Sequence, residues 1–242
     1  MGILNETLNL QKKSSYEKSP SPFFVFLVAA PLSSLAVGTT SPWVSDGVVV
    51  ADDTWENADV VQADDDTYRM YYAQGGSIYS ATSSQGKNWT TEDGVRVSQA
   101  GPAMSVLKLS DGTWRMYFTR NENEKLVMYS AVSPDGVSFT EEDGVRLEAG
   151  HPKGYDSETG IVHPSVIQTY AGKYRVYYDT FNTTGSGDEP WRILSAISED
   201  GLNFSIESGA RVNPTKDMPD GTQSVWSPFI RKKKRTYYLY FG

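Results

Sequence analysis

The stretch "SAVSPDGVSFTEEDGVRL", residues 130–147, occurs in three similar versions along the chain. An earlier version, "SATSSQGKNWTTEDGVRV", covers residues 80–97, and a later one, "SAISEDGLNFSIESGARV", covers residues 195–212. Repeats with a period of about fifty residues are typical of propellers and other repeat arrays. Each version joins strand-forming residues to a glycine-containing turn, so the repeat predicts paired antiparallel strands.

Four strand-like segments can be recognised in a repeat. The first is an inner segment, and the second is aromatic or β-branched on both faces, as expected of a strand buried between two sheets. The inner segments begin at Ala58, Ala103, His163 and Ser227, and the aromatic segments begin at Tyr68, Trp114, Tyr174 and Tyr237. Four strands per repeat predict an all-β fold, a β-propeller of four-stranded antiparallel blades. A β-sandwich with chance similarity between its strands is the alternative.

The repeats predict a propeller domain over residues 41–242. Complete blades are expected near 58–97, 103–147 and 163–212, and a partial blade over 226–242, with residues 43–50 as a closing outer strand. About three and a half blades favour a five-bladed ring that is truncated at its C-terminus. Irregular closure and closure with a partner are the alternatives, and open blade edges would allow self-association.

The N-terminal segment 1–38 is typical of an export signal. A polar stretch with three lysines precedes the mostly apolar residues 23–38, which are too few for a comfortable membrane span and end in a small-residue cleavage pattern. We expect a secreted, extracellular or periplasmic protein without a stable membrane span after cleavage. A retained membrane anchor is the alternative. Sequons for glycosylation occur at Asn5, Asn88, Asn182 and Asn203.

The composition argues against several classes of function. A net charge of −8 is unsuited to nucleic acid, whose phosphates need a basic surface. The basic run Arg231–Arg235 falls between two strand-like segments and is interpreted as a solvated turn. The absence of cysteine removes disulfides and thiol chemistry. His151 and His163 have no metal-ligand spacing to acidic residues, so the sequence predicts neither a metal nor a cofactor.

The repeated turn has a mechanical interpretation. In Ser133-Pro134-Asp135-Gly136 the Ser and Asp side chains can bind backbone N–H groups two or three residues on, and glycine accepts a positive φ. Gln85 replaces the aspartate in the first repeat. A turn tolerates such a replacement more easily than a catalytic acid does, so we interpret Asp135 as a turn residue.

From Trp43 to Gly242 the chain resembles the five-bladed propeller superfamily of arabinanase, levansucrase and invertase glycosidases (families 43 and 32), especially its uncharacterised bacterial members. The resemblance rests on Asp59-Val60-Val61 followed by Tyr68–Tyr72, on the matching segments of the later repeats and on the Ser-Ala-x-Ser turns. It implies the fold and a carbohydrate ligand, although one fold hosts many functions.

The resemblance also implies where a site would lie. In these glycosidases acidic residues project from the inner strands into an axial pocket, where one carboxylic acid protonates the leaving oxygen and a second carboxylate activates water or attacks the sugar. Asp59 is the one carboxylate of an inner strand and is expected to be the general base. A hydrogen bond to a neighbouring blade is its alternative role. Glu158, in an insertion before the third inner strand, is expected to be the general acid, or else a solvated loop charge.

Four further residues are expected to bind substrate. Asn57 and His163 occupy the position before the proline-like residue of their repeats, which is often aspartate in the family, and Asp156 lies in the same insertion as Glu158. Trp226 precedes the fourth inner strand and is expected to stack on a sugar, or else to pack in the core.

Three functions follow from these residues. The chain is expected to be a secreted glycosidase-like propeller that binds a poly- or oligosaccharide and hydrolyses it. A non-catalytic carbohydrate-binding propeller and a structural or protein-interaction propeller are the alternatives. The absence of an acid at Ala103-Met104-Ser105, the start of the second inner strand, weakens the first reading.

Overall fold

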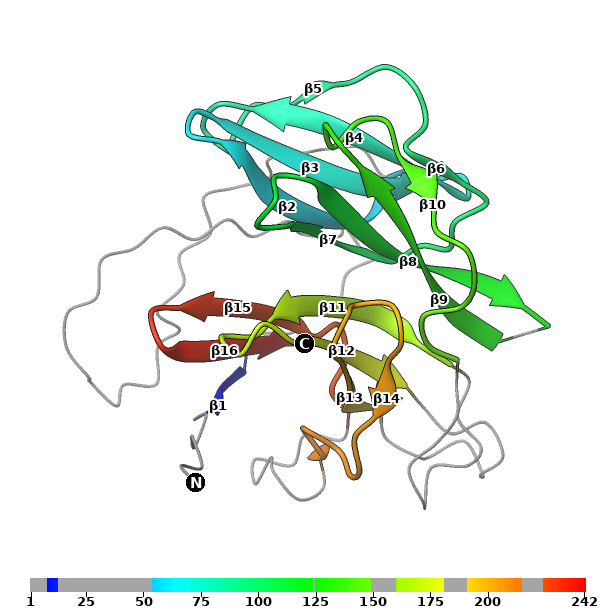
Figure 1. The fold of residues 1–242 in the computed structure, drawn as a ribbon, viewed down its shortest axis with the longest axis vertical. Helices are drawn as coiled ribbons and strands as arrows, with labels where there is room; N and C mark the ends of the chain where they lie inside the picture. The colour runs from blue at the N-terminus through cyan, green and yellow to red at the C-terminus, as the bar shows by residue number, and fades with distance from the viewer. Residues whose placement is uncertain (1–7, 13–53, 124, 149–159, 181–190, 215–223) are drawn as a thin grey trace.

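The computed structural model describes residues 8–12, 54–123, 125–148, 160–180, 191–214 and 224–242, whose strands form four sheets (Figure 1). The first sheet contains β2 (Glu56–Asp64), β3 (Thr67–Gln74), β4 (Ser77–Ser83) and β5 (Thr90–Thr91), and β6 (Val97–Ser98) also pairs with β4. The second contains β7 (Met104–Lys108), β8 (Trp114–Glu122), β9 (Lys125–Ser133) and β10 (Thr140–Glu141). The third contains β11 (Val162–Gln168), β12 (Tyr174–Thr180), β13 (Arg192–Ser198) and β14 (Ser205–Ile206).

The fourth sheet has a different composition. β15 (Phe229–Lys233) and β16 (Thr236–Phe241) are the first two strands of a repeat, and β1 (Leu8–Lys12) pairs with β16 in parallel (Figure 1). Thus a strand of this sheet comes from the segment expected to be an export signal. Residues 43–50, expected to close the last blade, lie outside the described residues.

The fold class is therefore confirmed as a β-propeller of four-stranded antiparallel blades, with a fourth blade that contains two strands of the repeat. Its sheets pack face to face, and the second strands are buried on both faces as predicted: Met70 and Tyr71 are 0% exposed. Each fully buried side chain of this size contributes roughly 1.5–3 kcal/mol to stability. In the part of the chain that the structure describes, no helix has the length and hydropathy needed to cross a membrane.

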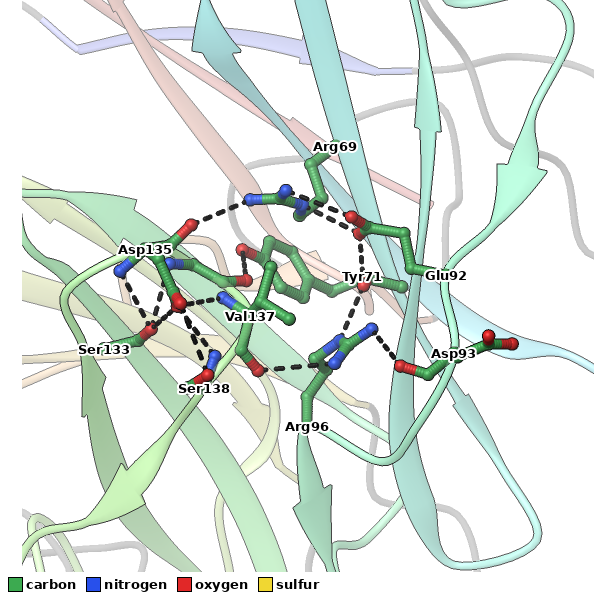
Figure 2. A network of polar contacts seen from close by, with 11 residues as sticks. Arg69, Tyr71, Glu92, Asp93, Arg96, Ser133, Asp135, Val137 and Ser138 are labelled. Atoms are coloured by element: carbon green, nitrogen blue, oxygen red, sulfur yellow. Dashed lines mark hydrogen bonds and ion pairs between the residues drawn. The ribbon is translucent and has the colours of Figure 1, made fainter.

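Adjacent blades are joined by a repeated set of hydrogen bonds that we call the inter-blade clasp (Figure 2). On β3, the Tyr71 hydroxyl donates to the carbonyl oxygen of Gly136 at 2.7 Å, and Arg69 Nη1 donates to that of Asp135 at 3.1 Å. The next clasp repeats this arrangement, with Tyr117 and Arg115 of β8 donating to Gly201 and Asp200 at 3.0 and 3.2 Å. In both clasps, a β-strand of one blade binds the repeated turn of the next.

Each clasp arginine is held by an acid on its own blade. The Arg69 guanidinium pairs with Glu92 at 2.8 Å (Figure 2). Ser80 donates to the same carboxylate at 2.7 Å. These contacts lower the pKa of Glu92 although burial opposes them. Burial raises the pKa of Tyr71, so its hydroxyl keeps the proton that it donates across the clasp.

The turn itself is built as the sequence predicts. Ser133 Oγ accepts the N–H of Gly136 at 2.9 Å, and Asp135 Oδ1 accepts those of Val137 and Ser138 at 2.8 and 2.7 Å (Figure 2). These backbone hydrogen bonds lower the pKa of Asp135. The side chain of Asp135 is thus a turn acceptor, and its role is structural.

The first repeat offers a test of this role. Gln85→Asp is expected to raise the free energy of unfolding by about 1 kcal/mol, because the shorter, charged side chain can accept the N–H groups of Lys87 and Asn88 as Asp135 does in its turn. Urea unfolding of the wild type and of Gln85→Asp measures the difference. Gln85→Asn, which has an acceptor without the charge, is the control and should gain less. An aspartate variant no more stable than the wild type contradicts the prediction.

Candidate functional site

The inner strands are connected through one equivalent position in each repeat. Asp59 Oδ2 accepts the N–H of Val106 at 2.7 Å, so β2 is bound to β7. Ser105 Oγ accepts the N–H of Val166 at 3.0 Å, and Ser165 Oγ accepts that of Ile230 at 3.1 Å. The side chains at these positions therefore connect each blade to the next near the axis.

Arg231 makes the corresponding connection from the fourth sheet back to the first. Its Nη2 donates to the carbonyl oxygen of Val60 at 2.8 Å and lies 3.6 Å from Asp59 Oδ1. The four inner strands β2, β7, β11 and β15 are thus bonded in a cycle. The interpretation of the whole basic run as a turn is wrong for Arg231–Lys233, which belong to β15, and Arg231 binds the first inner strand.

Asp59 is more enclosed than a typical catalytic base. The residue is 7% exposed. Burial has the largest effect on the pKa of its carboxyl and raises it, although the charge of Arg231 and two backbone N–H groups act to lower it. The hydrogen bond to Val106 is the neighbouring-blade contact that we had considered as its alternative role. Its function as a general base stays a prediction.

The inner strands begin at what we call the mouth of the propeller, defined by Asn57, His163 and Ser227. These three residues occupy the same position in their repeats and share a positive φ, of 33°, 41° and 48°. The strand registers shift beside the first two, as at a β-bulge, which redirects a side chain out of the regular ladder. Asn57 Nδ2 accordingly donates to the carbonyl oxygen of Pro102 in the second blade at 2.8 Å.

His163 forms a pair with a buried acid that the sequence did not reveal. Its Nδ1 lies 3.1 and 3.0 Å from the two carboxylate oxygens of Asp179 on β12, whose side chain is 0% exposed. Burial raises the pKa of Asp179, while the hydrogen bond and charge of His163 act in the opposite direction. An ionised carboxylate only accepts hydrogen bonds, so when Asp179 is ionised Nδ1 of His163 is the donor, and Nε2 of a neutral imidazole is then an acceptor.

The same carboxylate reaches the fourth blade. Asp179 Oδ2 accepts the N–H of Ser227, the residue after Trp226, at 3.2 Å. Trp226 and Gly242 exchange backbone hydrogen bonds of 3.3 and 2.9 Å. The Trp226 residue is 38% exposed, and its indole lies so close to Gly242 that a Cβ there would come within 2.8 Å of Nε1.

Of the predicted substrate-binding residues, His163 binds Asp179, and the same carboxylate accepts the N–H of Ser227, the residue after Trp226. Asn57 is bonded to the second blade, while Asp156 and Glu158 lie outside the described residues. The sequence analysis did not identify Asp179, although the repeats contain one signal for it. Among the equivalent residues Ala73, Thr119, Asp179 and Gly242, only Asp179 is acidic. Among the described residues, no group of three or more metal-ligating side chains converges.

The mouth combines groups that suit a polyhydroxylated ligand. Trp226 is an exposed aromatic residue, and Asp179 holds the imidazole of His163 by one ring nitrogen. Ligand sites commonly join a hydrophobic or aromatic surface to a small number of placed polar groups. Such groups can orient a small polar molecule.

No family model matches the chain, and comparison with curated proteins gives no match. Solved structures share its fold. A thermostable family-43 glycoside hydrolase matches with a TM-score of 0.62 and 15% identity, over 77% of this chain and 62% of that one. An endo-arabinase from Bacteroides thetaiotaomicron matches with a TM-score of 0.60 and 14% identity, over 79% and 73%.

A family-32 β-fructofuranosidase from Bombyx mori matches with a TM-score of 0.58 and 14% identity, over 78% of this chain and 43% of that one. The chain thus spans less than two thirds of the length of two of these three structures. It has the propeller fold of these glycosidases. Identities this low show the fold alone.

Proposed function

We propose that this chain is a secreted, glycosidase-like propeller that binds a poly- or oligosaccharide at its mouth. The proposal rests on one observation above all: Asp179 joins His163 to Ser227 at the start of the fourth inner strand, and Ser227 directly follows the exposed Trp226. The glycosidase fold supports a carbohydrate as the ligand.

The two side chains would act on different parts of a sugar. The indole of Trp226 would stack on the apolar face of a pyranose or furanose ring, burying aromatic surface. Nε2 of His163 would accept a hydrogen bond from a ring hydroxyl, since Asp179 holds the opposite nitrogen as the donor. Asn57 and Asp156 are proposed to add polar contacts at the edge of the site.

Calorimetric titration with arabino-, xylo-, fructo- and β-1,2-manno-oligosaccharides tests the proposal, since the solved relatives include proteins described for these sugars. Trp226→Ala is expected to weaken binding at least tenfold, a loss of about 1.4 kcal/mol. Tyr170→Ala is the control, because Tyr170 is a 50% exposed aromatic residue on the β11–β12 turn, at the opposite ends of the inner strands. Equal affinity of Trp226→Ala and the wild type would falsify the proposal.

Hydrolysis of the bound saccharide is a second candidate function. It is favoured by the buried Asp59 carboxyl, whose Oδ1 accepts no hydrogen bond within the described part of the chain and whose pKa is raised, as is common at catalytic sites. Asp59 would serve as general base and Glu158 as general acid. A crystal structure with ligand should then find the two carboxyl groups roughly 5 to 9.5 Å apart, and a separation beyond that range excludes this mechanism.

A further inference from the structure

The basic run Arg231–Arg235 lies in a hairpin at the end of the propeller opposite the mouth (Figure 1). β15 ends at Lys233, which is opposite Thr236 of β16. Lys234 and Arg235 therefore make the two-residue turn between the strands. All five basic residues are exposed. A chain with a net charge of −8 thus concentrates five positive charges at one hairpin.

The exposure of this turn follows from its place at the end of the propeller. In each complete blade the turn between the first two strands is exposed as well, at residues 65–66, 111–112 and 171–172. The second blade is bonded to a neighbour on each side, and its turn is still exposed. Packing of the blades against one another therefore leaves such turns accessible to a partner.

Two of the five basic residues have partners in neighbouring blades. Arg231 binds the first inner strand. Lys232 Nζ donates to the carbonyl oxygen of Gln168 at 2.9 Å and lies 5.1 Å from the centroid of the Tyr170 ring. By contrast, residues 233–235 form no ion pair with any residue that the structure describes. Their charges are therefore available to a ligand.

The turn keeps a lysine where a glycine would fit more easily. Lys234 has a φ of 54°, in the left-handed region that is strained for a residue with a Cβ. The corresponding turns of the second and third blades use Gly112 and Gly172 at their positive φ, of 88° and 82°. Adjacent positive charges also repel one another. Neither feature stabilises the free hairpin, and strain of this kind is typical of positions that are kept for binding.

We propose that the hairpin residues Lys232–Arg235 bind an acidic polysaccharide, whose carboxylates pair with their ammonium and guanidinium groups. The guanidinium of Arg235 can hold a carboxylate through two parallel N–H bonds, and the lysines add point charges beside it. The choice of a saccharide rests on the proposed function, in which the mouth at the opposite end of the inner strands also binds a saccharide.

The other turns at this end argue against a broad anionic partner. The first and second blades present Asp65, Asp66 and Asp111 on the corresponding exposed turns. A membrane or a nucleic acid duplex that reached the hairpin would also approach these carboxylates and be repelled by them. A single polysaccharide chain is narrow enough to contact the hairpin alone, since charges beyond the Debye length, about 8 Å at physiological ionic strength, are largely screened.

Calorimetric titration of the full chain with a hexamer of galacturonic acid tests the proposal. Lys234→Asn/Arg235→Gln is expected to weaken binding at least tenfold, because it removes both charges of the turn while asparagine accepts a positive φ. The matched control is Lys87→Gln/Lys125→Gln, which makes the same change in net charge at exposed residues outside the hairpin and should bind as the wild type does. Any binding of the methyl-esterified hexamer, which lacks the charges, should be equal in the wild type and the hairpin variant.

Two further titrations separate this surface from the mouth. Trp226→Ala is expected to keep the affinity for the galacturonate hexamer, and Lys234→Asn/Arg235→Gln to keep the affinity for the neutral oligosaccharide. A wild type that binds a neutral oligosaccharide but not the galacturonate hexamer overturns the hairpin surface alone. A wild type that binds only the hexamer, and loses it in the hairpin variant, supports the hairpin surface and overturns the mouth site.

Three other outcomes overturn the proposal. Equal affinity of the hairpin variant and the wild type for the hexamer shows that the hairpin is not the binding surface. An equal loss in the Lys87→Gln/Lys125→Gln control shows a response to net charge alone. Tighter binding of poly-glutamate, of phosphatidylserine vesicles or of duplex DNA, each at the same concentration of negative charge as the hexamer, assigns the hairpin to another class of partner.

Discussion

Gly136→Ala is expected to lower the free energy of unfolding by about 4 kcal/mol, the largest loss from any single methyl group considered for this protein. Gly136 has a φ of 74°, which alanine adopts only with strain. A Cβ would also come within 2.8 Å of Arg69 Nη1 and within 2.9 Å of both Trp114 Cε2 and the Tyr71 hydroxyl. The first clasp could accommodate this Cβ only if the hydrogen bonds of Arg69 and Tyr71 to the turn were broken.

The control for this variant is Gly112→Ala. Gly112 has a similarly positive φ of 88°, but no atom lies within 4 Å of a Cβ placed there. This variant should therefore lose only the backbone component, about 1–2 kcal/mol. Urea unfolding of both variants separates the two contributions, and equal losses would show that the clasp does not enclose Gly136.

Asp59→Ala is expected to cost about 2–3 kcal/mol of unfolding free energy, while Asp59→Ser should cost less than about 1 kcal/mol. Alanine leaves the buried N–H of Val106 without an acceptor. Serine supplies the hydroxyl that Ser105 and Ser165 use at the same position of the following repeats. Chemical denaturation at pH 7 measures both losses, and a serine variant as unstable as the alanine variant would contradict the proposed connection between blades.

The pH dependence of stability distinguishes the same variants. Burial raises the pKa of Asp59 in the folded state above its ordinary value of 3.8, so the ionised form costs stability. The folded state therefore binds more protons than the unfolded state between 3.8 and the raised pKa. Asp59 thus contributes a gain in stability as the pH falls through that window, a gain that Asp59→Ser lacks. If the difference in unfolding free energy between the wild type and Asp59→Ser stays constant with pH, this prediction is contradicted.

Asp59→Ser also bears on the second candidate function. If Asp59 is a general base, the serine variant should stay folded and lose hydrolysis of any saccharide that the wild type cleaves. If its role is confined to joining blades, stability and turnover should both be kept. Saccharide binding through Trp226 should survive in either case.

The blades could be predicted from the sequence because their signals are local. The turn at Ser133–Gly136 requires only hydrogen bonds within a few residues, and the aromatic second strands show their burial in their composition. Repetition of these signals fixed the number and order of the sheets. The equivalent Ser105 and Ser165 were also visible, and they indicate the joining role of Asp59.

The contacts between distant residues could not be predicted in the same way. His163 and Asp179 lie sixteen positions apart and meet because β11 and β12 pair with a register shift at the mouth. β1 pairs in parallel with β16, which lies more than two hundred residues later in the chain, and no local sequence pattern signals this pairing. Arg231 belongs to a run of exposed residues, and its hydrogen bond to Val60 forms because the inner strands of the fourth and first sheets lie next to each other.

The direction of the clasp has a consequence for how the ring is made. In both clasps the donors precede the acceptors along the chain: Tyr71 comes before Gly136, and Tyr117 before Gly201. A ribosome therefore releases each donor strand before the turn that it will capture. Because folding during synthesis starts with the N-terminal parts of a chain, we expect each new blade to meet a prepared surface on the blade before it, and the order of translation to become the order of assembly.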